Sequence, residues 1–191
     1  MEIDLHGTIG ADREHGELIW AGLDNLDWIV RFKPSALLTR IKRSVLQDER
    51  RVMGDRVLLF KHDGTLSAYV WFRTGHFKDE VDGIIYTLPS GTVWLFDGRV
   101  DTAHRRKGLY KRLLKAAARD LSEAGYSRIV LAVDYLNRNS VRGHLSVGAS
   151  VIGRVFVIRV LGRGACMAKT NTSSKFNLDF SGPNNHVELL I

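Results

Sequence analysis

The sequence contains a single cysteine and no long apolar run, and each absence removes a class of protein. Cys166 stands alone among 191 residues, so the chain can form no internal disulfide and no cysteine-rich metal site. No run of about eighteen apolar residues is present, so we expect no membrane span. Residues 1–4 include two acids where a secretory signal would carry cations. These features predict a protein of the reducing cytoplasm.

Metal-binding patterns are also missing from the sequence. The seven histidines never show the His-x-x-x-His spacing beside a carboxylate that would hold a metal, so we predict no metal site. No internal repeat is present either. With 45% apolar residues, the chain is long enough to bury one substantial core, and a single domain is the simplest expectation.

Short apolar runs and amphipathic segments alternate along the chain. Asp63 and Gly64 separate two apolar runs, which is a strong signal for a β-hairpin. A continuous apolar run at 128–133 is typical of a strand that is buried on both faces. The pattern predicts strands at 28–32, 57–60, 66–72, 84–88, 92–96, 128–133 and 151–161, and helices at 35–49 and 109–121. We therefore expect an α/β fold with a mixed sheet.

Positive charge is concentrated in one segment of the chain. Residues 99–119 hold eight lysines and arginines and one acid, which gives this segment a net charge of +7. The whole chain has the same formal charge, so the remaining residues sum to zero. Such a local excess favours a discrete polyanionic ligand over a coat of nucleic acid.

The charged segment joins a predicted strand to a predicted helix. Three cations, Arg105, Arg106 and Lys107, are followed by Gly108 and then by the helix. Unpaired N–H groups and the helix dipole already make a helix N-terminus positive, so cations are unfavourable there unless an anion binds. Gly108 allows the backbone to approach that anion closely. The segment therefore predicts a phosphate-binding site.

The helix that follows has an apolar arc and a charged arc. The apolar arc consists of Leu109, Leu113, Leu114, Ala116, Ala117 and Leu121. The opposite arc carries Lys111, Arg112, Lys115 and Arg119. We expect the leucines to pack on a sheet, and the later cations have the pattern of an ordinary solvated face.

A specific motif is found within this segment. It has neither the Gly-Lys-Ser/Thr of a Walker loop nor the Gly-x-Gly-x-x-Gly of a dinucleotide site. Val100, Arg105 and Gly108 stand at the spacing of V-x-P-x-x-R/Q-x-x-G-x-G/A, with Thr102 in place of the proline and Tyr110 in place of the last small residue. This pattern resembles the acetyl-CoA-binding motif of the GNAT acetyltransferases. In that family, backbone amides of this loop hold the pyrophosphate of coenzyme A.

A second block strengthens the resemblance. Asn137, Ser140 and His144 precede Gly148-Ala149 at the spacings where GNAT proteins commonly show Asn-x-x-Ala/Ser, a tyrosine and Gly-Phe. The stretch between them is predicted to be helical, with Asn139 or Ser140 as its N-cap and Gly148 as its stop. The resemblance covers residues 56–161.

The resemblance implies the fold and the domain limits. It implies the acyl-CoA N-acyltransferase fold, in which a central mixed, mainly antiparallel sheet is flanked by helices. We expect a GNAT domain at residues 26–164. Residues 1–25 form an N-terminal extension of undetermined structure, and residues 165–191 form a C-terminal extension that is flexible in part, since 169–175 is strongly polar.

The resemblance also implies an activity, a donor and a set of binding residues. The expected activity is transfer of an acetyl or other acyl group from acetyl-CoA to a primary amine. The residues expected to bind the donor are Gly98, Val100, Arg105, Arg106, Lys107, Gly108, Leu109, Tyr110, Asn137 and Ser140.

Two residues are candidates for proton transfer. In the family, the tyrosine of the second block often gives a proton to the departing thiolate, and His144 stands at that position here. A histidine titrates near neutrality, so it can serve the same purpose; the alternative is a packed, inert histidine. Asp97 ends the strand that enters the motif, and it is a candidate base for the amine, either directly or through water. Its neighbour Gly98 suggests a β-bulge.

The acceptor and the partners are less defined. A small-molecule or peptide amine is expected as the acceptor, and Trp94 and Phe96, on one face of a strand, are candidates for a wall of its cleft. Two alternatives remain open: a CoA-binding GNAT-like module without turnover, and a nucleic-acid-binding protein that uses the basic helix. Nucleic acid is disfavoured because no aromatic residues cluster beside the cations. A homodimer is compatible with the sequence.

Overall fold

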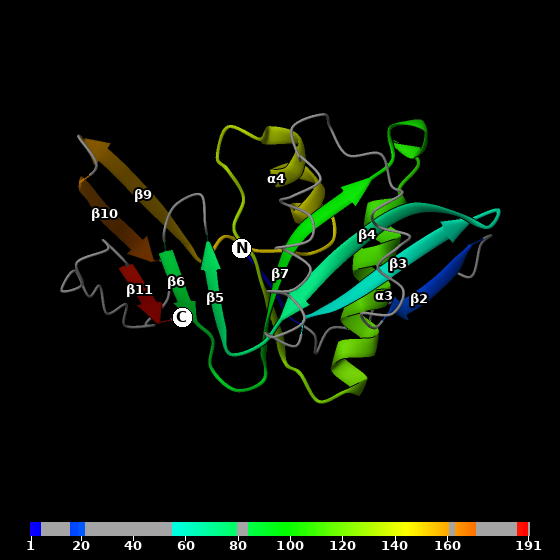
Figure 1. Ribbon diagram of the computed structural model, residues 1–191, viewed down its shortest axis with the longest axis horizontal. Helices are drawn as coiled ribbons and strands as arrows, with labels where there is room; N and C mark the ends of the chain where they lie inside the picture. The colour runs from blue at the N-terminus through cyan, green and yellow to red at the C-terminus, as the bar shows by residue number, and fades with distance from the viewer. Residues whose placement is uncertain (5–15, 22–54, 80–83, 161–162, 171–186, 191) are drawn as a thin grey trace, which may run out of the picture.

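The structure is a computed structural model that describes residues 1–4, 16–21, 55–79, 84–160, 163–170 and 187–190. Within these residues, the chain forms a central six-stranded sheet, a two-stranded sheet and a three-stranded sheet, with two α-helices beside the central one (Figure 1). The predicted strand at 28–32 and the predicted helix at 35–49 lie outside the described residues.

The central sheet has the strand order β1-β8-β7-β4-β3-β2. Its strands are β1 (Glu2–Asp4), β2 (Glu17–Ala21), β3 (Arg56–His62), β4 (Thr65–Arg73), β7 (Thr92–Val100) and β8 (Arg128–Val130). Every neighbouring pair is antiparallel except β7 and β8, which run parallel. The predicted mixed, mainly antiparallel sheet is therefore confirmed. Two of its strands, β1 and β2, come from the first 25 residues, whose structure the sequence left undetermined.

The hairpin predicted around Asp63 and Gly64 is present between β3 and β4. Both turn residues have positive φ, 49° for Asp63 and 70° for Gly64, as the tight two-residue turn of a twisted hairpin requires. This hairpin supplies the middle of the central sheet, so the local turn signal fixes the register of two core strands.

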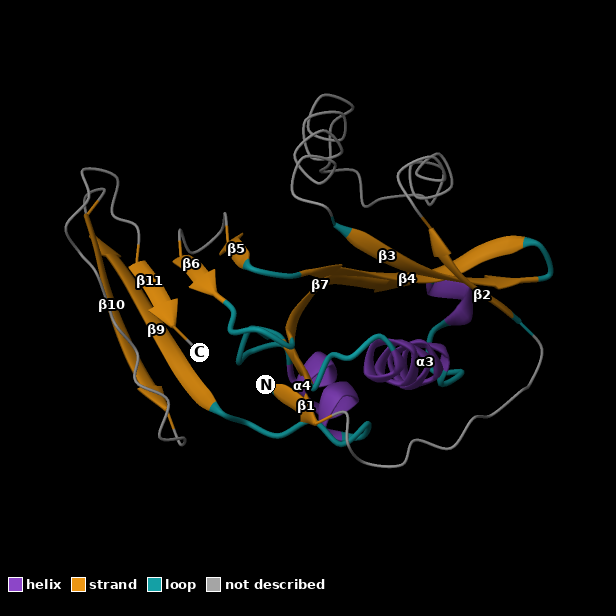
Figure 2. Ribbon diagram, turned by 90° about the horizontal axis from the view of Figure 1, so that it is seen from below, coloured by secondary structure: helices purple, strands orange, loops and turns teal. Residues whose placement is uncertain are grey.

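The main helix, α3 (Leu109–Glu123), packs along one face of the central sheet (Figure 2). Its buried side chains are Leu109, Leu113, Leu114, Ala117, Ala118 and Leu121, which meet apolar residues of β3, β4, β7 and β8. The predicted apolar arc is thus confirmed, with Ala118 added to it and Ala116 half-buried at its edge. This burial holds the helix, and with it the basic segment, in a fixed position against the sheet.

The other sheets lie beyond the central one. β5 (His76–Asp79), β6 (Ile84–Thr87) and β11 (Val187–Leu190) form the three-stranded sheet. β9 (Gly153–Val160) pairs with β10 (Arg163–Thr170). The strands predicted at 84–88 and 151–161 correspond to β6 and β9, although β6 does not join the central sheet. Most of the polar segment 169–175 falls outside the described residues.

The parallel strands β7 and β8 are paired over a short stretch only. Pairing between them runs only from Thr92 to Trp94 and from Arg128 to Val130, whereas β7 continues to Val100. The strand predicted at 128–133 therefore ends three residues early. Because β7 leads into α3 and β8 leads toward the second helix, α4 (Arg138–Leu145), both helix N-termini lie beyond the carboxyl ends of neighbouring parallel strands. No described helix is long and apolar enough to cross a membrane.

Candidate functional site

The predicted bulge is present in β7 next to the motif. Trp71 of β4 pairs with Phe96, and Tyr69 pairs with Arg99, so β7 has one residue more than β4 over this stretch. Asp97, within the bulge, has a φ of 45°, which is uncommon for a residue with a side chain. The bulge interrupts the regular pairing and redirects the end of β7. Strain of this kind tends to occur at functional sites.

The loop after β7 is fixed by contacts within itself and to β4. Its first residue, Asp101, donates a backbone hydrogen bond to the Ser67 carbonyl at 2.9 Å. The Asp101 carboxylate faces His104 Nδ1 at 3.2 Å, and this hydrogen bond holds the pKa of Asp101 below its ordinary value. Arg105 donates from Nε to the Val100 carbonyl at 3.3 Å. The loop is therefore shaped before any ligand arrives.

The N-terminus of α3 has the geometry of an anion site. Arg106 and Gly108 both have positive φ, 64° and 73°, so the backbone turns twice into the left-handed region just before the helix. Such turns gather successive N–H groups into a concave surface that binds anions. Among the described residues, no side chain caps the first turn of this helix. A Cβ on Gly108 would meet nothing within 4 Å, so the cradle is open to solvent.

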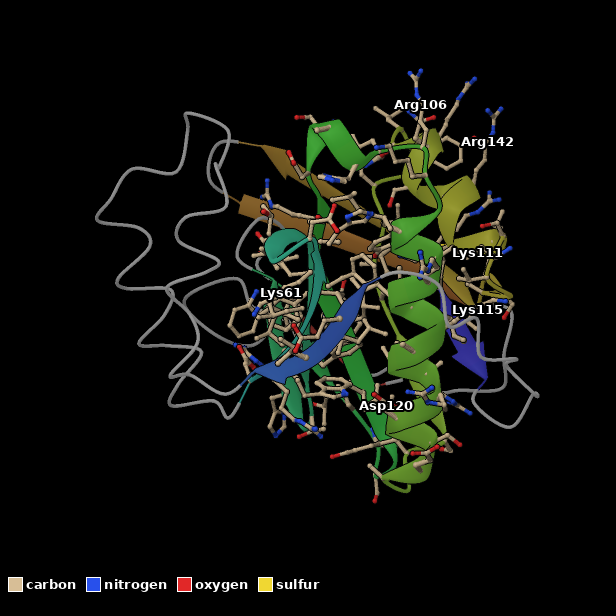
Figure 3. The ribbon with its side chains drawn as sticks, turned by 90° about the vertical axis from the view of Figure 1, so that its right-hand side faces the viewer. Lys61, Arg106, Lys111, Lys115, Asp120 and Arg142 are labelled. Carbon is tan, nitrogen blue, oxygen red and sulfur yellow. The ribbon has the colours of Figure 1, made fainter. Side chains whose placement is uncertain are left out.

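The predicted cations surround this cradle. Arg105, Arg106 and Lys107 are exposed. Figure 3 shows Lys111 and Lys115 along α3 and Arg106 and Arg142 at the end of the molecule where α3 begins. The positive charge inferred from the sequence is therefore gathered at one place.

The N-terminus of α4 is capped by its own sequence. Asn137 is the N-cap residue, and its Oδ1 accepts a hydrogen bond from the Ser140 backbone N–H at 3.1 Å. The prediction that Asn139 or Ser140 is the N-cap is therefore wrong, because Asn137 is the first of several cap-forming residues to reach a free N–H group.

Tyr110 and His144, the two departures from the family pattern, are in direct contact. The Tyr110 hydroxyl lies 3.0 Å from His144 Nε2, and the two rings meet edge to face with centroids 5.4 Å apart. His144 Nδ1 lies 2.8 Å from the Ser140 carbonyl oxygen. A carbonyl only accepts, so Nδ1 carries the proton and Nε2 accepts the hydrogen bond that Tyr110 donates.

Both rings are held in the neutral form by burial. His144 is only 3% exposed. Burial lowers its pKa, the positive charge of the chain N-terminus lowers it further, and the Ser140 carbonyl acts in the opposite direction. Burial raises the pKa of the Tyr110 phenol well above its ordinary value. At neutral pH, the pair therefore consists of a neutral phenol and a neutral imidazole.

Tyr110 also fills the space beneath the bulge. A Cβ on Gly98 would lie 2.7 Å from the Tyr110 hydroxyl oxygen, so only glycine permits this approach. The phenol thus connects β7, α3 and α4 at the point where β7 has left its pairing with β8.

Asp97, the other predicted proton-transfer residue, is hydrogen-bonded to Arg99. Its Oδ1 accepts a hydrogen bond from Arg99 Nε at 3.0 Å. Its carboxylate is half-buried at the bulge, where it is close to the strand end. The described residues contain no group of three metal-ligating side chains.

The face of β7 opposite α3 carries an aromatic cluster, and a buried ion pair from β4 and the residue before β3 lies near it; the sequence revealed neither. Trp94 is 2% exposed, with its ring stacked 4.4 Å from Tyr86 and 4.9 Å from Phe77. It is therefore part of the core rather than a wall of a cleft. Nearby, Arg73 makes two hydrogen bonds to the buried Asp55 carboxylate, at 2.5 and 2.7 Å. No sequence signal links Asp55, which precedes β3, to Arg73 at the end of β4.

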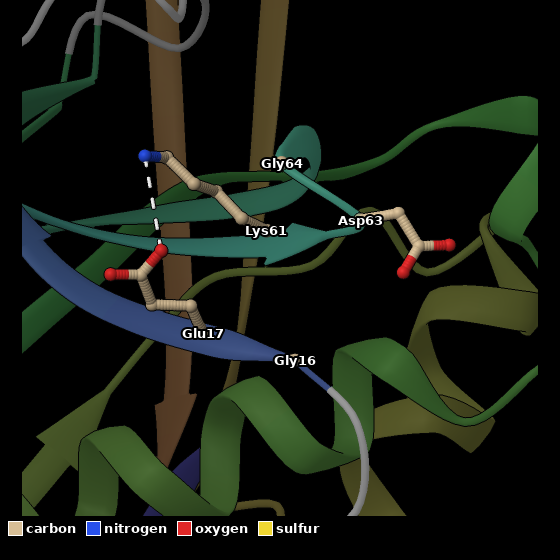
Figure 4. Close-up of a pocket in the computed structure, with 5 residues that line it drawn as sticks. All are labelled: Gly16, Glu17, Lys61, Asp63 and Gly64. Carbon is tan, nitrogen blue, oxygen red and sulfur yellow. Dashed lines mark ion pairs between the residues drawn. The ribbon is translucent and has the colours of Figure 1, made fainter.

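A pocket of about 450 Å³ lies elsewhere, beside the turn of the β3–β4 hairpin (Figure 4). The described residues that line it are Gly16, Glu17, Lys61, Asp63 and Gly64. Lys61 Nζ and Glu17 Oε2 are 4.0 Å apart across two strands. None of these residues belongs to the predicted site, and an ion pair at this distance with a largely exposed Glu17 carboxylate contributes little energy.

Comparison with known proteins identifies a family model that fits most of the chain. Residues 23–148 match the model described as "Acetyltransferase (GNAT) family". This match includes the bulge, the cradle, α3 and α4. Comparison with curated protein sequences finds no match to this chain.

Solved structures with the same fold are numerous. An aminoglycoside N-acetyltransferase in complex with a bisubstrate analogue of coenzyme A has a TM-score of 0.58 at 16% identity, over 77% of this chain and 99% of that one. A putative acetyltransferase from Salmonella typhimurium with acetyl-CoA has a TM-score of 0.53 at 20% identity, over 84% and 96%. A ribosomal-protein-alanine N-acetyltransferase from Brucella melitensis has a TM-score of 0.53 at 18% identity, over 76% and 99%.

Proposed function

Because the chain belongs to the GNAT family of acetyltransferases, we propose that it transfers an acetyl or related acyl group from acetyl-CoA to a primary amine. The observation that carries this proposal is the uncapped N-terminus of α3, which is preceded by two left-handed residues and three exposed cations. Acetyl-CoA is a substrate in this reaction, since it enters with an acyl group and leaves without it.

The residues of the cradle fit the pyrophosphate of coenzyme A. The backbone N–H groups of Leu109 and Tyr110 are in the first turn of α3, where the helix provides no partner. Gly108 leaves the cradle open, and the cations Arg105, Arg106 and Lys107 supply charge to the phosphates. Val100 is half-buried against the core and fixes the start of the loop.

The rest of the donor is proposed to extend between the ends of β7 and β8. Parallel strands that part at their carboxyl ends provide the usual crevice for a ligand in an α/β sheet. We propose that Gly98, near the end of β7, and Asn137 and Ser140, at the start of α4, line this crevice. We propose that Asn137 acts there by fixing α4, because its side-chain oxygen is already bonded to Ser140.

The reaction requires a neutral amine, a stabilised tetrahedral intermediate and a proton for the departing thiolate. We propose Asp97 as the base that takes a proton from the ammonium form of the acceptor, directly or through water. His144 is proposed to take part in the later transfer to sulfur. In this proposal, the base lies at the bulge of β7 and the proton donor lies on α4.

The acceptor is proposed to be a small molecule or a peptide that carries a primary amine. Support comes from the structural neighbours, which include aminoglycoside acetyltransferases and an enzyme named for ribosomal-protein alanine. The sequence identity to these neighbours is low, so they support a primary amine as the acceptor without favouring one particular amine.

Binding of coenzyme A is the direct test of the donor site. Calorimetry and thermal unfolding with coenzyme A should both report binding, and a ligand at about 100 times its Kd adds about 2.7 kcal/mol to the free energy of unfolding. Absence of binding at millimolar coenzyme A would exclude the donor site.

Turnover is tested separately from binding. Acetyl-CoA is incubated with a panel of amino acids, polyamines, aminosugars and peptides, and free thiol is measured. Release that depends on the amine supports the proposed transfer. Tight binding of coenzyme A with no amine-dependent release would instead indicate a binding module without turnover.

A further inference from the structure

The contact between Tyr110 and His144 joins two positions that were separate irregularities in the sequence. Tyr110 is bulky where the motif has a small residue, and His144 replaces the tyrosine of the second block. In the structure, the larger side chain at one position is matched by a shorter one at the other. The Tyr110 hydroxyl extends from α3 to α4, where it forms a hydrogen bond with the shorter His144 side chain.

We propose that Tyr110 is the catalytic residue that contacts the reacting atoms, and that His144 acts through it as a proton relay. This inference rests on the proposed acetyl transfer. It differs from a direct role for His144, because both ring nitrogens of that buried side chain are already engaged, Nδ1 with Ser140 and Nε2 with Tyr110.

The direction of the hydrogen bonds determines what the pair can do. The Tyr110 hydroxyl donates a hydrogen bond to His144 Nε2, and His144 Nδ1 donates one to the Ser140 carbonyl. This is the arrangement of a hydroxyl activated by an imidazole that a backbone acceptor holds in one tautomer. The Tyr110 oxygen can therefore accept a proton from a substrate while its own proton passes to His144.

The position of the hydroxyl places it at the proposed crevice. Its oxygen lies directly beneath Gly98, in the bulge that interrupts the regular pairing of β7 with β4. From the other side, the hydroxyl meets α4, which follows β8. No other described tyrosine bridges these elements.

The proton transfers balance without an external acid. The amine nitrogen bonds to the thioester carbonyl carbon, and the carbonyl electron pair moves to oxygen. The surplus proton on nitrogen passes to the Tyr110 oxygen, while the Tyr110 proton moves to His144 Nε2. The electron pair on oxygen then re-forms the carbonyl as the carbon–sulfur bond breaks, and the pair of that bond stays on sulfur. The sulfur takes the proton from Tyr110, and His144 returns one to the phenol oxygen. One proton has moved from nitrogen to sulfur, and both side chains are restored.

One oxygen can serve both partners because nitrogen and sulfur are bonded to the same carbon in the intermediate. The imidazolium exists only between the two transfers. During that time, its other proton stays on Nδ1, which donates to the Ser140 carbonyl, and this hydrogen bond supports the charged ring. The neutral resting state of both groups is restored after each turnover.

The first test removes single functional groups. Tyr110→Phe keeps the ring between Gly98 and α4 but deletes the hydroxyl, so kcat with the best amine of the panel should fall by about 100-fold or more. The Kd of coenzyme A should change by less than about threefold, because the cradle uses backbone amides and exposed cations. Tyr126→Phe is the matched control: it removes a phenol that packs on the same core but lies after α3, and its kcat should equal that of the parent.

His144→Gln tests whether His144 transfers a proton or only holds Tyr110 in place. A glutamine amide can accept the Tyr110 hydrogen bond, but it cannot hold the transferred proton. We expect kcat to fall as far as in Tyr110→Phe, and the double variant to be no slower than either single one, because the two residues act as a unit. Parent-like turnover in either single variant would overturn the inference.

A second test does not depend on turnover. The ¹⁵N resonances of the His144 ring are measured with coenzyme A and with desulfo-coenzyme A, which lacks the sulfur. If Tyr110 lies at the sulfur, only coenzyme A shifts the Nε2 resonance, and Tyr110→Phe abolishes that difference. Equal responses to the two ligands would overturn the inference even in a protein that binds both.

The outcomes distinguish this inference from the proposed function. If neither ligand binds, the donor site itself is wrong. If a sulfur-dependent shift occurs and no amine is acetylated, Tyr110 lies at the sulfur as inferred, and the proposed acceptor class is wrong.

Discussion

The two helices that follow the parallel strands begin in opposite ways. At α4, Asn137 accepts a hydrogen bond from the Ser140 N–H, and the chain itself completes the first turn. At α3, the preceding residue is Gly108 in the left-handed region, no described side chain caps the turn, and three cations add positive charge. Both helix starts lie at the same edge of the central sheet.

This difference assigns different tasks to the two ends. A capped helix start needs no ligand to satisfy its first turn. At α4, the cap holds the side chains of Ser140 and His144 in place. An uncapped start with added cations is electrostatically unfavourable until an anion occupies it. In the proposed function, one helix start therefore orients groups and the other binds the donor. Changes at the cradle before α3 should act on affinity, whereas changes at the N-cap of α4 should act on stability.

The largest effect is expected from reversing one charge at the α3 cradle. Arg106→Glu replaces a cation beside the phosphates with an anion, so the Kd of coenzyme A should rise by about 100-fold, as expected for loss of a charge-assisted contact and gain of repulsion. Calorimetry measures this change. Arg154→Glu makes the same change of charge at the exposed start of β9 and should leave the Kd within about threefold. Equal effects of the two variants would mean that overall charge, and not the cradle, governs binding.

A second pair of variants changes Gly108, the N-cap residue of α3. Gly108→Asp places a carboxylate where the phosphate is proposed to bind, and Gly108→Asn places a neutral group of the same shape there. Both residues tolerate the left-handed region, so backbone strain is matched between them. Coenzyme A should bind about tenfold more weakly to the Asp variant than to the Asn variant. Similar affinities would show that the negative ligand group does not lie at this helix start.

The start of α3 was largely accessible to prediction from the sequence, and the surroundings of α4 were not. A run of cations before a glycine and an amphipathic helix are local patterns, and local patterns predicted α3, its buried face and the hairpin at Asp63. The N-cap of α4 was misplaced because Asn137, Asn139 and Ser140 all have cap-forming side chains, and only the backbone path selects among them.

The contact between Tyr110 and His144 lay beyond any local pattern. The two residues are 34 positions apart, and their meeting depends on how α3 and α4 both pack against the sheet. Similarly, β8 ends at Val130 although apolar residues continue, because its neighbour β1 offers only three paired residues and β7 turns away after Trp94. The sequence showed both departures from the motif, but their relation required the fold.

A smaller effect is expected at the capped helix. Asn137→Ala leaves the Ser140 N–H without its acceptor, so the free energy of unfolding should fall by about 1 kcal/mol. Chemical denaturation measures this loss. Asn137→Asp keeps the cap and should recover most of the stability. If the Asp variant is stable but binds coenzyme A tenfold more weakly, then Asn137 contacts the donor directly and the division of tasks between the two helix starts is wrong.

The smallest effect concerns the pH dependence of stability at the point where the two helices meet. Burial lowers the pKa of His144 in the folded protein, so on acidification the unfolded chain takes up a proton near the ordinary value of 6.5 before the folded protein does. Stability is therefore highest above this value and falls as the pH decreases toward the folded-state pKa. Between pH 7.5 and 6.0, this one group should remove up to about 0.8 kcal/mol from the free energy of unfolding.

Denaturation at the two pH values in the parent and in His144→Gln isolates the contribution, because the variant keeps all other titrating groups. A parent whose stability changes no more than that of the variant would mean that His144 is protonated as readily in the fold as outside it, and its Nε2 would then donate to Tyr110 instead of accepting from it.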